Sequence, residues 1–198
     1  ITTIPADFSS ATFFICTAAI PGCDIVLKGL DFHDTQGDKR VVDVLRAMGA
    51  DIHLTDQGLH IKGTQLKGME IDLADMPDAL PALAVVGCLA EGTTQIRNVP
   101  HARVKETDRI AVMCAELQKM GAIISELPDG LIIQTSQLIG QSVQSYKDHR
   151  VAMALAIAGL AAQGTTRIQS AEAVGVTFPQ FPQLLKQLGA AIETQESA

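Results

Sequence analysis

Residues 117–122 read Leu-Gln-Lys-Met-Gly-Ala, and this phrase returns with small changes at residues 45–50 (Leu-Arg-Ala-Met-Gly-Ala) and 185–190 (Leu-Lys-Gln-Leu-Gly-Ala). Each copy looks like the last turn of a helix followed by glycine, the residue that most readily takes a left-handed conformation just past a helix end. The copies lie about 70 residues apart. Self-similarity at such a period is typical of a chain built from repeated supersecondary units.

The residues around this phrase predict the content of one unit. Short strands flank an apolar helix, an amphipathic helix carries the phrase, and a hairpin follows it. In the first unit we expect strand Thr2–Ile4, helix Ser9–Ile20, strand Ile25–Lys28, helix Asp38–Met48, and a hairpin of strands Asp51–Thr55 and Leu59–Lys62. The second unit runs from Glu70 to Thr135, with its hairpin turning on Asp129-Gly130. The third runs from Ser142 to a single last strand, Ala190–Thr194.

We therefore expect residues 1–198 to form a single α/β domain of about three repeated βαβαββ units, at about residues 1–66, 67–136 and 137–198. The helix expected over Val151–Ala162 is apolar all round and must be buried, as must its counterparts in the other units. The expected fold has three buried helices surrounded by amphipathic helices and small mixed sheets. The helix starts would gather at one end, where their unpaired N–H groups favour anions.

Composition limits the class of protein. With 198 residues, 47% of them apolar, the chain can bury its own core. The net charge of −7 argues against a nucleic-acid surface, and the longest uncharged apolar run, about 12 residues, is too short to cross a membrane. The four cysteines show no C-x-x-C spacing, and three of them fall in apolar helical runs, where we expect them to pack as small apolar residues in a reducing compartment, and hence in a cytoplasmic protein. The sequence shows no metal-ligand spacing, and because it opens with Ile1 we expect a fragment or a processed product.

Two of the expected helix starts carry cations, although a helix N-terminus is already electropositive. Lys105 and Arg109 stand at the start of the amphipathic helix of the second unit, and Arg150 stands at the start of the buried helix of the third. For the first start alone, a solvated end neutralised by Glu106 and Asp108 is a sufficient explanation. The buried helix offers no solvated face for its cation, so the two starts together favour a site for phosphate or carboxylate anions.

The chain resembles the C-terminal half of 5-enolpyruvylshikimate-3-phosphate (EPSP) synthase in three ordered stretches: Met76-Pro77-Asp78-Ala79-Leu80, Arg103-Val104-Lys105-Glu106-Thr107-Asp108-Arg109 and Asp148-His149-Arg150-Val151-Ala152-Met153-Ala154. The resemblance covers essentially the whole chain. It implies a reaction that moves the enolpyruvyl group of phosphoenolpyruvate to the 5-hydroxyl of shikimate 3-phosphate, with no metal or organic cofactor. It also implies one of two similar globules that close on these substrates, so that the chain lacks an N-terminal partner domain and is inactive alone.

The resemblance implies a role for each matching residue. Asp78 becomes the base that contacts the shikimate hydroxyl, although its place before a helix would by itself favour an N-cap. Lys105 and Glu106 match an acid–base and substrate-contacting pair, with Glu106 as the proton donor to the methylene carbon. Arg109 and Arg150 match the arginines that bind phosphoenolpyruvate, for which forked guanidinium contacts are suited.

Four further residues receive assignments. His101 falls where some relatives carry Asn near the shikimate phosphate, but a strand-end histidine satisfied by the backbone would look the same. We expect His149 to pack rather than react, and Asp7 to cap the first helix. Val176 stands where some members of the family carry Lys two residues before a Phe-Pro pair, so this cation is absent.

Two other functions remain open on the sequence. Related enzymes transfer an enolpyruvyl group to a UDP-sugar on the same units, but the Lys-Glu-Thr-Asp-Arg and Asp-His-Arg runs favour the shikimate enzyme. A non-catalytic anion-binding module that had lost its partner half would keep the same three motifs.

Overall fold

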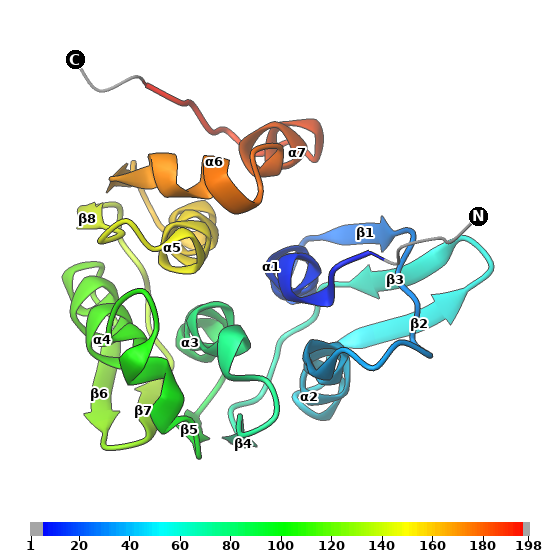
Figure 1. Ribbon diagram of the computed structural model, residues 1–198, viewed down its shortest axis with the longest axis horizontal. Helices are drawn as coiled ribbons and strands as arrows, with labels where there is room; N and C mark the ends of the chain where they lie inside the picture. The colour runs from blue at the N-terminus through cyan, green and yellow to red at the C-terminus, as the bar shows by residue number, and fades with distance from the viewer. Residues whose placement is uncertain (1–5, 196–198) are drawn as a thin grey trace.

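Three helices form the centre of the computed structural model, which describes residues 6–195. These helices are α1 (Phe8–Ala19), α3 (Leu80–Leu89) and α5 (His149–Ala161), and each contacts the other two. Figure 1 looks along them and shows the remaining elements arranged around this centre. Almost all of α3 and the middle of α5 are buried, as their all-round apolar pattern predicts.

The first segment adds a second helix and a hairpin to α1. After α1 come β1 (Asp24–Leu27), the 3-10 turn η1 (Gly37–Arg40), α2 (Val41–Ala47), β2 (Asp51–Thr55) and β3 (Gly58–Lys62). The three strands form an antiparallel sheet in the order β1-β3-β2. Ile52, Leu59 and Ile61 are buried while their neighbours along the strands are more exposed, which is the alternation of a sheet with one face on the core.

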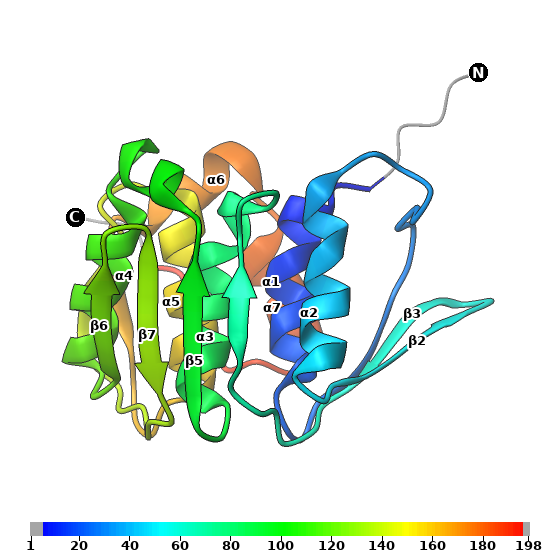
Figure 2. The same ribbon diagram turned by 90° about the horizontal axis from the view of Figure 1, so that it is seen from below.

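The second segment contains the largest sheet. Its elements are β4 (Glu70–Asp72), the 3-10 turn η2 (Pro77–Ala79), α3, β5 (Thr93–Arg97), the 3-10 turn η3 (Pro100–Val104), α4 (Arg109–Lys119), β6 (Ile123–Leu127) and β7 (Gly130–Gln134). The strand order is β4-β5-β7-β6, with β4 parallel to β5 and the other pairs antiparallel. Figure 2 shows this mixed sheet in front of α3 and α4, which pack against it.

The third segment is less regular. It contains β8 (Ser142–Gln144), α5, β9 (Arg167–Gln169), the 3-10 turn η4 (Ala171–Ala173), α6 (Val174–Thr177) and α7 (Phe181–Gln187). β8 and β9 form a parallel two-stranded sheet. Phe181 at the start of α7 packs edge-on against Phe13 and Phe14 of α1, which closes the ring of elements around the core.

The strand predicted over Ala190–Thr194 is wrong, because residues 190–194 have irregular backbone. A strand is stable only when a neighbouring strand takes up its N–H and C=O groups, and no second hairpin arm follows it within the described part of the chain. The strand predicted over Thr2–Ile4 lies outside the described residues. The helix predicted over Asp38–Met48 is present, but its first turn is the 3-10 turn η1.

The repeated phrase forms the same helix end three times, as predicted. The glycines Gly49, Gly121 and Gly189 have left-handed φ values of +105°, +89° and +95°. In each case the N–H of the alanine after the glycine donates a hydrogen bond to the carbonyl five residues earlier: Ala50 to Leu45, Ala122 to Leu117 and Ala190 to Leu185, at 2.9, 3.0 and 3.0 Å. This pairing satisfies carbonyl groups that the helix end would otherwise leave open.

The cysteines pack as expected. Cys16, Cys88 and Cys114 are buried on α1, α3 and α4, and burial raises the pKa of the Cys88 thiol to about 12. Among the helices described here, none is long and apolar enough to cross a membrane.

Candidate active site

The starts of α3, α4 and α5 meet at one end of the molecule, and Figure 2 shows those of α3 and α4 at its upper edge. The turn η2 leads into α3 and contacts η3, which precedes α4. This arrangement brings together residues that are distant in sequence: Asp78 in η2, Arg109 at the first position of α4, and Asp148 and Arg150 at the start of α5. The gathering of these helix starts was expected from the sequence.

Arg109 is the centre of this group, although only 1% of its side chain is exposed. Nε and Nη2 donate to the two carboxylate oxygens of Asp148 at 2.8 and 3.2 Å. Nη1 donates to Asp78 Oδ1 at 2.8 Å, and Nη2 also donates to Glu106 Oε2 at 2.6 Å. A buried guanidinium is tolerated only when its charge is paired and its N–H groups are satisfied, so these three carboxylates fix its position.

Asp78 faces three cations. Besides its contact with Arg109, its Oδ1 lies 3.4 Å from Lys105 Nζ and its Oδ2 lies 3.4 Å from Arg150 Nη2. Partial burial raises the pKa of the Asp78 carboxyl, but the positive charges of Arg150, Arg109 and Lys105 outweigh this effect and hold the pKa below its usual value. The interpretation of Asp78 as an N-cap is wrong, because α3 is preceded by Ala79 and no side chain caps it among the described residues.

The starts of α4 and α5 are capped by the carboxylates of Asp108 and Asp148. Asp108 accepts the Ala111 N–H at 3.0 Å, and Asp148 accepts the N–H groups of Arg150 and Val151 at 2.8 and 3.3 Å. This differs from the expectation that open N–H groups would attract an anion, because a capping carboxylate already satisfies them. An anion at this end would be bound mainly by cationic side chains.

Asp38, in η1, lies near enough to Arg150 and Asp78 for their charges to act on it, and this was not expected from the sequence. Burial raises the pKa of its carboxyl; Arg150 opposes this effect, and the negative charge of Asp78 adds to it. In the sequence Asp38 looks like an ordinary acid in the first turn of an amphipathic helix. Asp38 differs from such an acid because the charges of Arg150 and Asp78 act on it in the folded chain.

Two residues of η3 lie away from the cluster. His101 is exposed in η3 and makes none of the ion pairs described above. Arg103 donates to Asp108 Oδ2 at 2.8 Å, to Glu126 Oε2 at 3.0 Å and to two backbone carbonyls near the β6–β7 turn. It therefore ties the η3 loop to the hairpin and has a structural role.

The other assigned residues lie as follows. Asp7 caps α1 as predicted, accepting the N–H groups of Ser9 and Ser10 at 3.0 and 2.9 Å. Burial lowers the pKa of His149, and the charge of neighbouring Arg150 adds to the effect, which favours the neutral imidazole. Val176 lies in α6 with 85% of its surface exposed.

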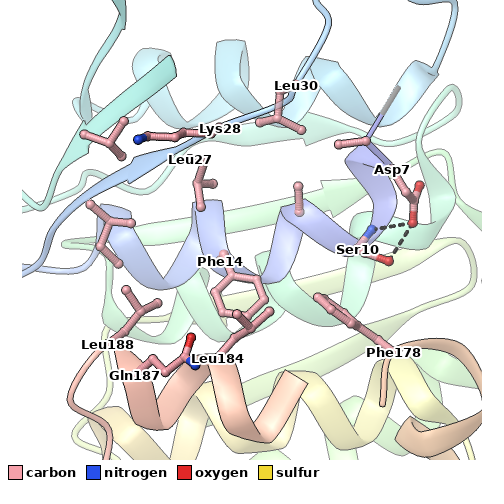
Figure 3. A pocket seen from close by; sticks show the side chains of 14 residues that line it. Asp7, Ser10, Phe14, Leu27, Lys28, Leu30, Phe178, Leu184, Gln187 and Leu188 are labelled. Atoms are coloured by element: carbon pink, nitrogen blue, oxygen red, sulfur yellow. Dashed lines mark hydrogen bonds between the residues drawn. The ribbon is translucent and has the colours of Figure 1, made fainter. Parts of the chain in front are cut away.

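A hollow of about 500 Å³ lies elsewhere, between α1, β1 and α7 (Figure 3). Its wall is largely apolar, and Phe14 and Leu184 face it from α1 and α7. The Asp7 carboxylate at its rim is hydrogen-bonded to Ser10, and Lys28 is the one cation among the described residues that line it. Without converging cations, this hollow does not offer an anion site.

Comparison with known proteins agrees with this architecture. The chain superimposes on an EPSP synthase from Acinetobacter baumannii with a TM-score of 0.89 and 35% sequence identity, over 97% of this chain and 48% of that one. The 3-phosphoshikimate 1-carboxyvinyltransferases of Ruminiclostridium cellulolyticum and Acetivibrio thermocellus are both 57% identical to it, over 191 and 194 residues. These matches cover 96% and 98% of this chain, but 45% and 46% of the relatives.

The fold is thus a mixed α/β fold with small mixed sheets, as in solved EPSP synthases. The sequence profile described as EPSP synthase (3-phosphoshikimate 1-carboxyvinyltransferase) matches residues 2–185. The chain belongs to the EPSP synthase family, and it spans about half the length of the curated relatives that it matches.

Proposed function

We propose that this chain carries one half of the active site of an enzyme that transfers the enolpyruvyl group of phosphoenolpyruvate to the 5-hydroxyl of shikimate 3-phosphate. The observation that carries the proposal is the convergence of Asp78, Glu106 and Asp148 on buried Arg109, in a chain of the EPSP synthase family. The reaction would belong to the shikimate pathway of aromatic amino acid synthesis. We place it in the cytoplasm, where the cysteines stay reduced.

In this proposal Asp78 accepts the proton of the attacking 5-hydroxyl. Its lowered pKa keeps the carboxylate ionised at neutral pH, as a base requires, but also makes it a weak base. The cations that lower this pKa are the same groups that would contact the phosphate and carboxylate oxygens of the substrates. Once bound anions neutralise these cations, the pKa of Asp78 rises and the carboxylate becomes a stronger base.

Protonated Glu106 is the proposed proton donor to the methylene carbon of phosphoenolpyruvate, with Lys105 beside it. The resulting tetrahedral intermediate then loses phosphate and one methyl proton, which restores the enolpyruvyl double bond. About half of the Glu106 side chain (49%) is exposed, and one oxygen is held 2.6 Å from Arg109 Nη2, so the carboxyl is positioned but still reachable. We assign Arg109 and Arg150 to the anionic groups of phosphoenolpyruvate, because guanidinium N–H groups match phosphate and carboxylate oxygens. Arg109 is buried and bound to Asp78, Glu106 and Asp148 in the chain without ligand, so in this proposal the substrate displaces Asp78 or Glu106 from it. His101, exposed on η3, is assigned to the edge of the shikimate phosphate.

The charge balance supports a half-site. The cluster pairs three cations with three carboxylates: Lys105, Arg109 and Arg150 with Asp78, Glu106 and Asp148. With all three carboxylates ionised, these six side chains sum to zero charge, and protonation of Glu106, which its role as proton donor requires, adds one positive charge. The two substrates bring two phosphates and two carboxylates that must be neutralised away from water. We infer that further cations come from a partner domain, corresponding to the half of the relatives that this chain does not match, and that the chain alone is inactive.

We also propose that residues 1–198 form one domain of three copies of a single unit, at about residues 1–66, 67–136 and 137–198, with the third incomplete. The three matching helix ends support this division. A second recurring feature is a left-handed residue after β1, β5 and β9: Gly29, Asn98 and Ser170, with φ of +83°, +60° and +57°. The same backbone turn at three corresponding places favours one repeated chain path.

A titration tests the anion site. The ¹⁵N-labelled chain at low ionic strength is titrated with phosphoenolpyruvate and, separately, with shikimate 3-phosphate, while backbone amide signals of residues 101–110 and 147–151 are followed. We expect weak, salt-sensitive shifts in both segments, because the contacts are ionic and lie on an open face. Shifts confined to other surfaces, such as the hollow between α1 and α7, would contradict the proposal.

Two lysine variants provide the matched comparison. Lys105→Gln removes a cation that lies 3.4 Å from Asp78, and Lys28→Gln removes an exposed cation beside the apolar hollow. We expect the first substitution to abolish the shifts and the second to leave them unchanged. Equal losses in the two variants would mean that binding follows net charge alone.

A further inference from the structure

Glu116 of α4 is a buried carboxylate that has no role in the proposed reaction, and its side chain is 0% exposed. Its Oε1 accepts hydrogen bonds from Lys119 Nζ at 2.7 Å and from the Tyr146 hydroxyl at 3.0 Å. Its Oε2 accepts from Lys119 Nζ at 2.8 Å and from the backbone N–H of Gln144 at 3.0 Å. Two of these four contacts therefore hold the segment that leads into α5.

This segment has an unusual backbone. Tyr146 and Lys147 both have left-handed φ values, +55° and +62°. Residues other than glycine adopt this conformation at a cost in free energy, so it persists only where the surroundings enforce it. The two residues come directly before Asp148, which holds Arg109.

The turn at the corresponding place before α3 has no such strain. Both turns contain the same hydrogen bond. The Met76 N–H donates to the Leu73 carbonyl at 3.2 Å before α3, and the Asp148 N–H donates to the Ser145 carbonyl at 3.0 Å before α5. Yet none of the described residues 73–76 has a positive φ. The fold alone therefore does not require the left-handed pair, and contacts particular to the third segment must stabilise it.

Helix α4 touches this segment at two points on one face. Arg109 binds Asp148, and Glu116, seven residues or about two helical turns further along α4, binds Tyr146. On the other side the Ser145 hydroxyl donates to the Ser170 carbonyl at 2.8 Å. Contacts from α4 and from Ser170 thus hold the left-handed turn, which lies directly before Asp148, the residue that binds Arg109.

We propose that Glu116 and Tyr146 are positioning residues for the active site. Their hydrogen bond holds the turn at Tyr146-Lys147, so that Asp148 keeps the Arg109 guanidinium oriented toward the substrate-facing carboxylates. Neither residue touches the proposed substrates. The consequence for ligand binding rests on the proposed function, whereas the effect on Arg109 is a property of the chain without ligand.

Tyr146→Phe tests this role, because it removes the hydroxyl and keeps the ring. In the ¹⁵N-labelled chain without ligand, hydrogen exchange of the Arg109 Nε–H reports how firmly Asp148 holds the guanidinium. We expect exchange to accelerate by about tenfold or more, the effect of losing a hydrogen bond to a charged partner. Glu116→Gln should act in the same direction, and in Tyr146→Phe the affinity for phosphoenolpyruvate should fall by a similar factor.

Lys119→Met is the matched control. Lys119 contacts the same carboxylate, but its side chain is 49% exposed and it does not touch the turn. We expect this variant to leave the Arg109 Nε–H exchange within about twofold of the wild type, because the Tyr146 and Gln144 contacts that hold the turn remain. Loss of the lysine charge beside the buried Glu116 carboxylate lowers the overall stability instead. Backbone amides in the middle of α3 serve as a second control, because a general loss of stability would accelerate their exchange as well.

The outcomes separate the two proposals. Unchanged exchange of the Arg109 Nε–H in Tyr146→Phe, or equal acceleration in Lys119→Met, would overturn the positioning role. If the wild-type chain bound no phosphoenolpyruvate while the exchange rates behaved as expected, the positioning role would be supported and the proposed function would fail instead.

Discussion

Replacing Asp148 with asparagine should destabilise the chain far more than the same change at Asp108. Both residues are helix N-caps, and both bind an arginine: Asp148 binds Arg109 and Asp108 binds Arg103. Asparagine caps a helix about as well as aspartate. The substitution therefore removes the ion pair at each site while it leaves the cap largely intact.

Burial distinguishes the two pairs. The side chains of Arg109 and Asp148 are 1% and 0% exposed, whereas those of Arg103 and Asp108 are 27% and 35% exposed. Removing one partner of a buried pair costs about 3–5 kcal/mol, because the other charge is left uncompensated. Arg109 keeps two other carboxylates, so we expect about 2–4 kcal/mol for Asp148→Asn. For Asp108→Asn we expect about 1 kcal/mol or less, as for partly solvated pairs.

Urea unfolding of the purified chain at pH 7, followed by circular dichroism, measures both losses. The free energy of unfolding should fall by at least about 2 kcal/mol in Asp148→Asn and by about 1 kcal/mol or less in Asp108→Asn. Losses equal to within about 0.5 kcal/mol would refute the reasoning, because burial of the Arg109 cluster would then have no energetic weight.

The remaining predictions concern pH, backbone conformation and turnover. The pKa of Asp78 is lowered in the fold, so the stability that this carboxylate contributes is present above its unfolded pKa of about 3.9 and is lost as pH falls through the folded value. Asp78→Asn should therefore flatten the acid limb of a stability–pH curve measured by thermal unfolding. Burial raises the pKa of Asp38, so the sign reverses: Asp38→Asn should raise the melting temperature at pH 7, and the gain should vanish below about pH 3.9. Gly121 has a φ of +89°, so Gly121→Ala should lower the free energy of unfolding, measured in urea, by about 1 kcal/mol or more. At Gly175 an added Cβ meets nothing within 4 Å, so Gly175→Ala should leave the free energy of unfolding unchanged or raise it by up to about 1 kcal/mol. In an active assembly with the complementary half of a relative, Glu106→Gln should lower turnover by about two to four orders of magnitude in a phosphate-release assay.

The helices and their ends were predictable because their causes are local. An apolar run such as Val151–Ala158 cannot face water on any side, and Gly121 follows a last helical turn in the one conformation that glycine favours. The strand expected over Ala190–Thr194 failed for the opposite reason. Its apolar pattern is local, but a strand also needs a partner from another part of the chain.

The site was predictable in residue type and less so in geometry. A carboxylate such as Asp78, just before an apolar helix, fits both an N-cap and an ion pair, and only Arg109, 31 residues later, decides between them. Asp38, Glu116 and Asp148 look like ordinary helix acids in the sequence. Their roles depend on which charges the fold places opposite them, and spacing along the chain does not reveal this.

Phosphate release from phosphoenolpyruvate in the presence of shikimate 3-phosphate tests most directly whether this chain holds half of an EPSP synthase active site. The assay compares the chain alone, the unmatched part of the Acetivibrio thermocellus relative alone, and an equimolar mixture of the two. We predict no turnover by either part and measurable turnover by the mixture, which Asp78→Ala in the chain should abolish. Robust turnover by the chain alone would contradict the half-site, because the charges around Arg109 would then suffice for both substrates.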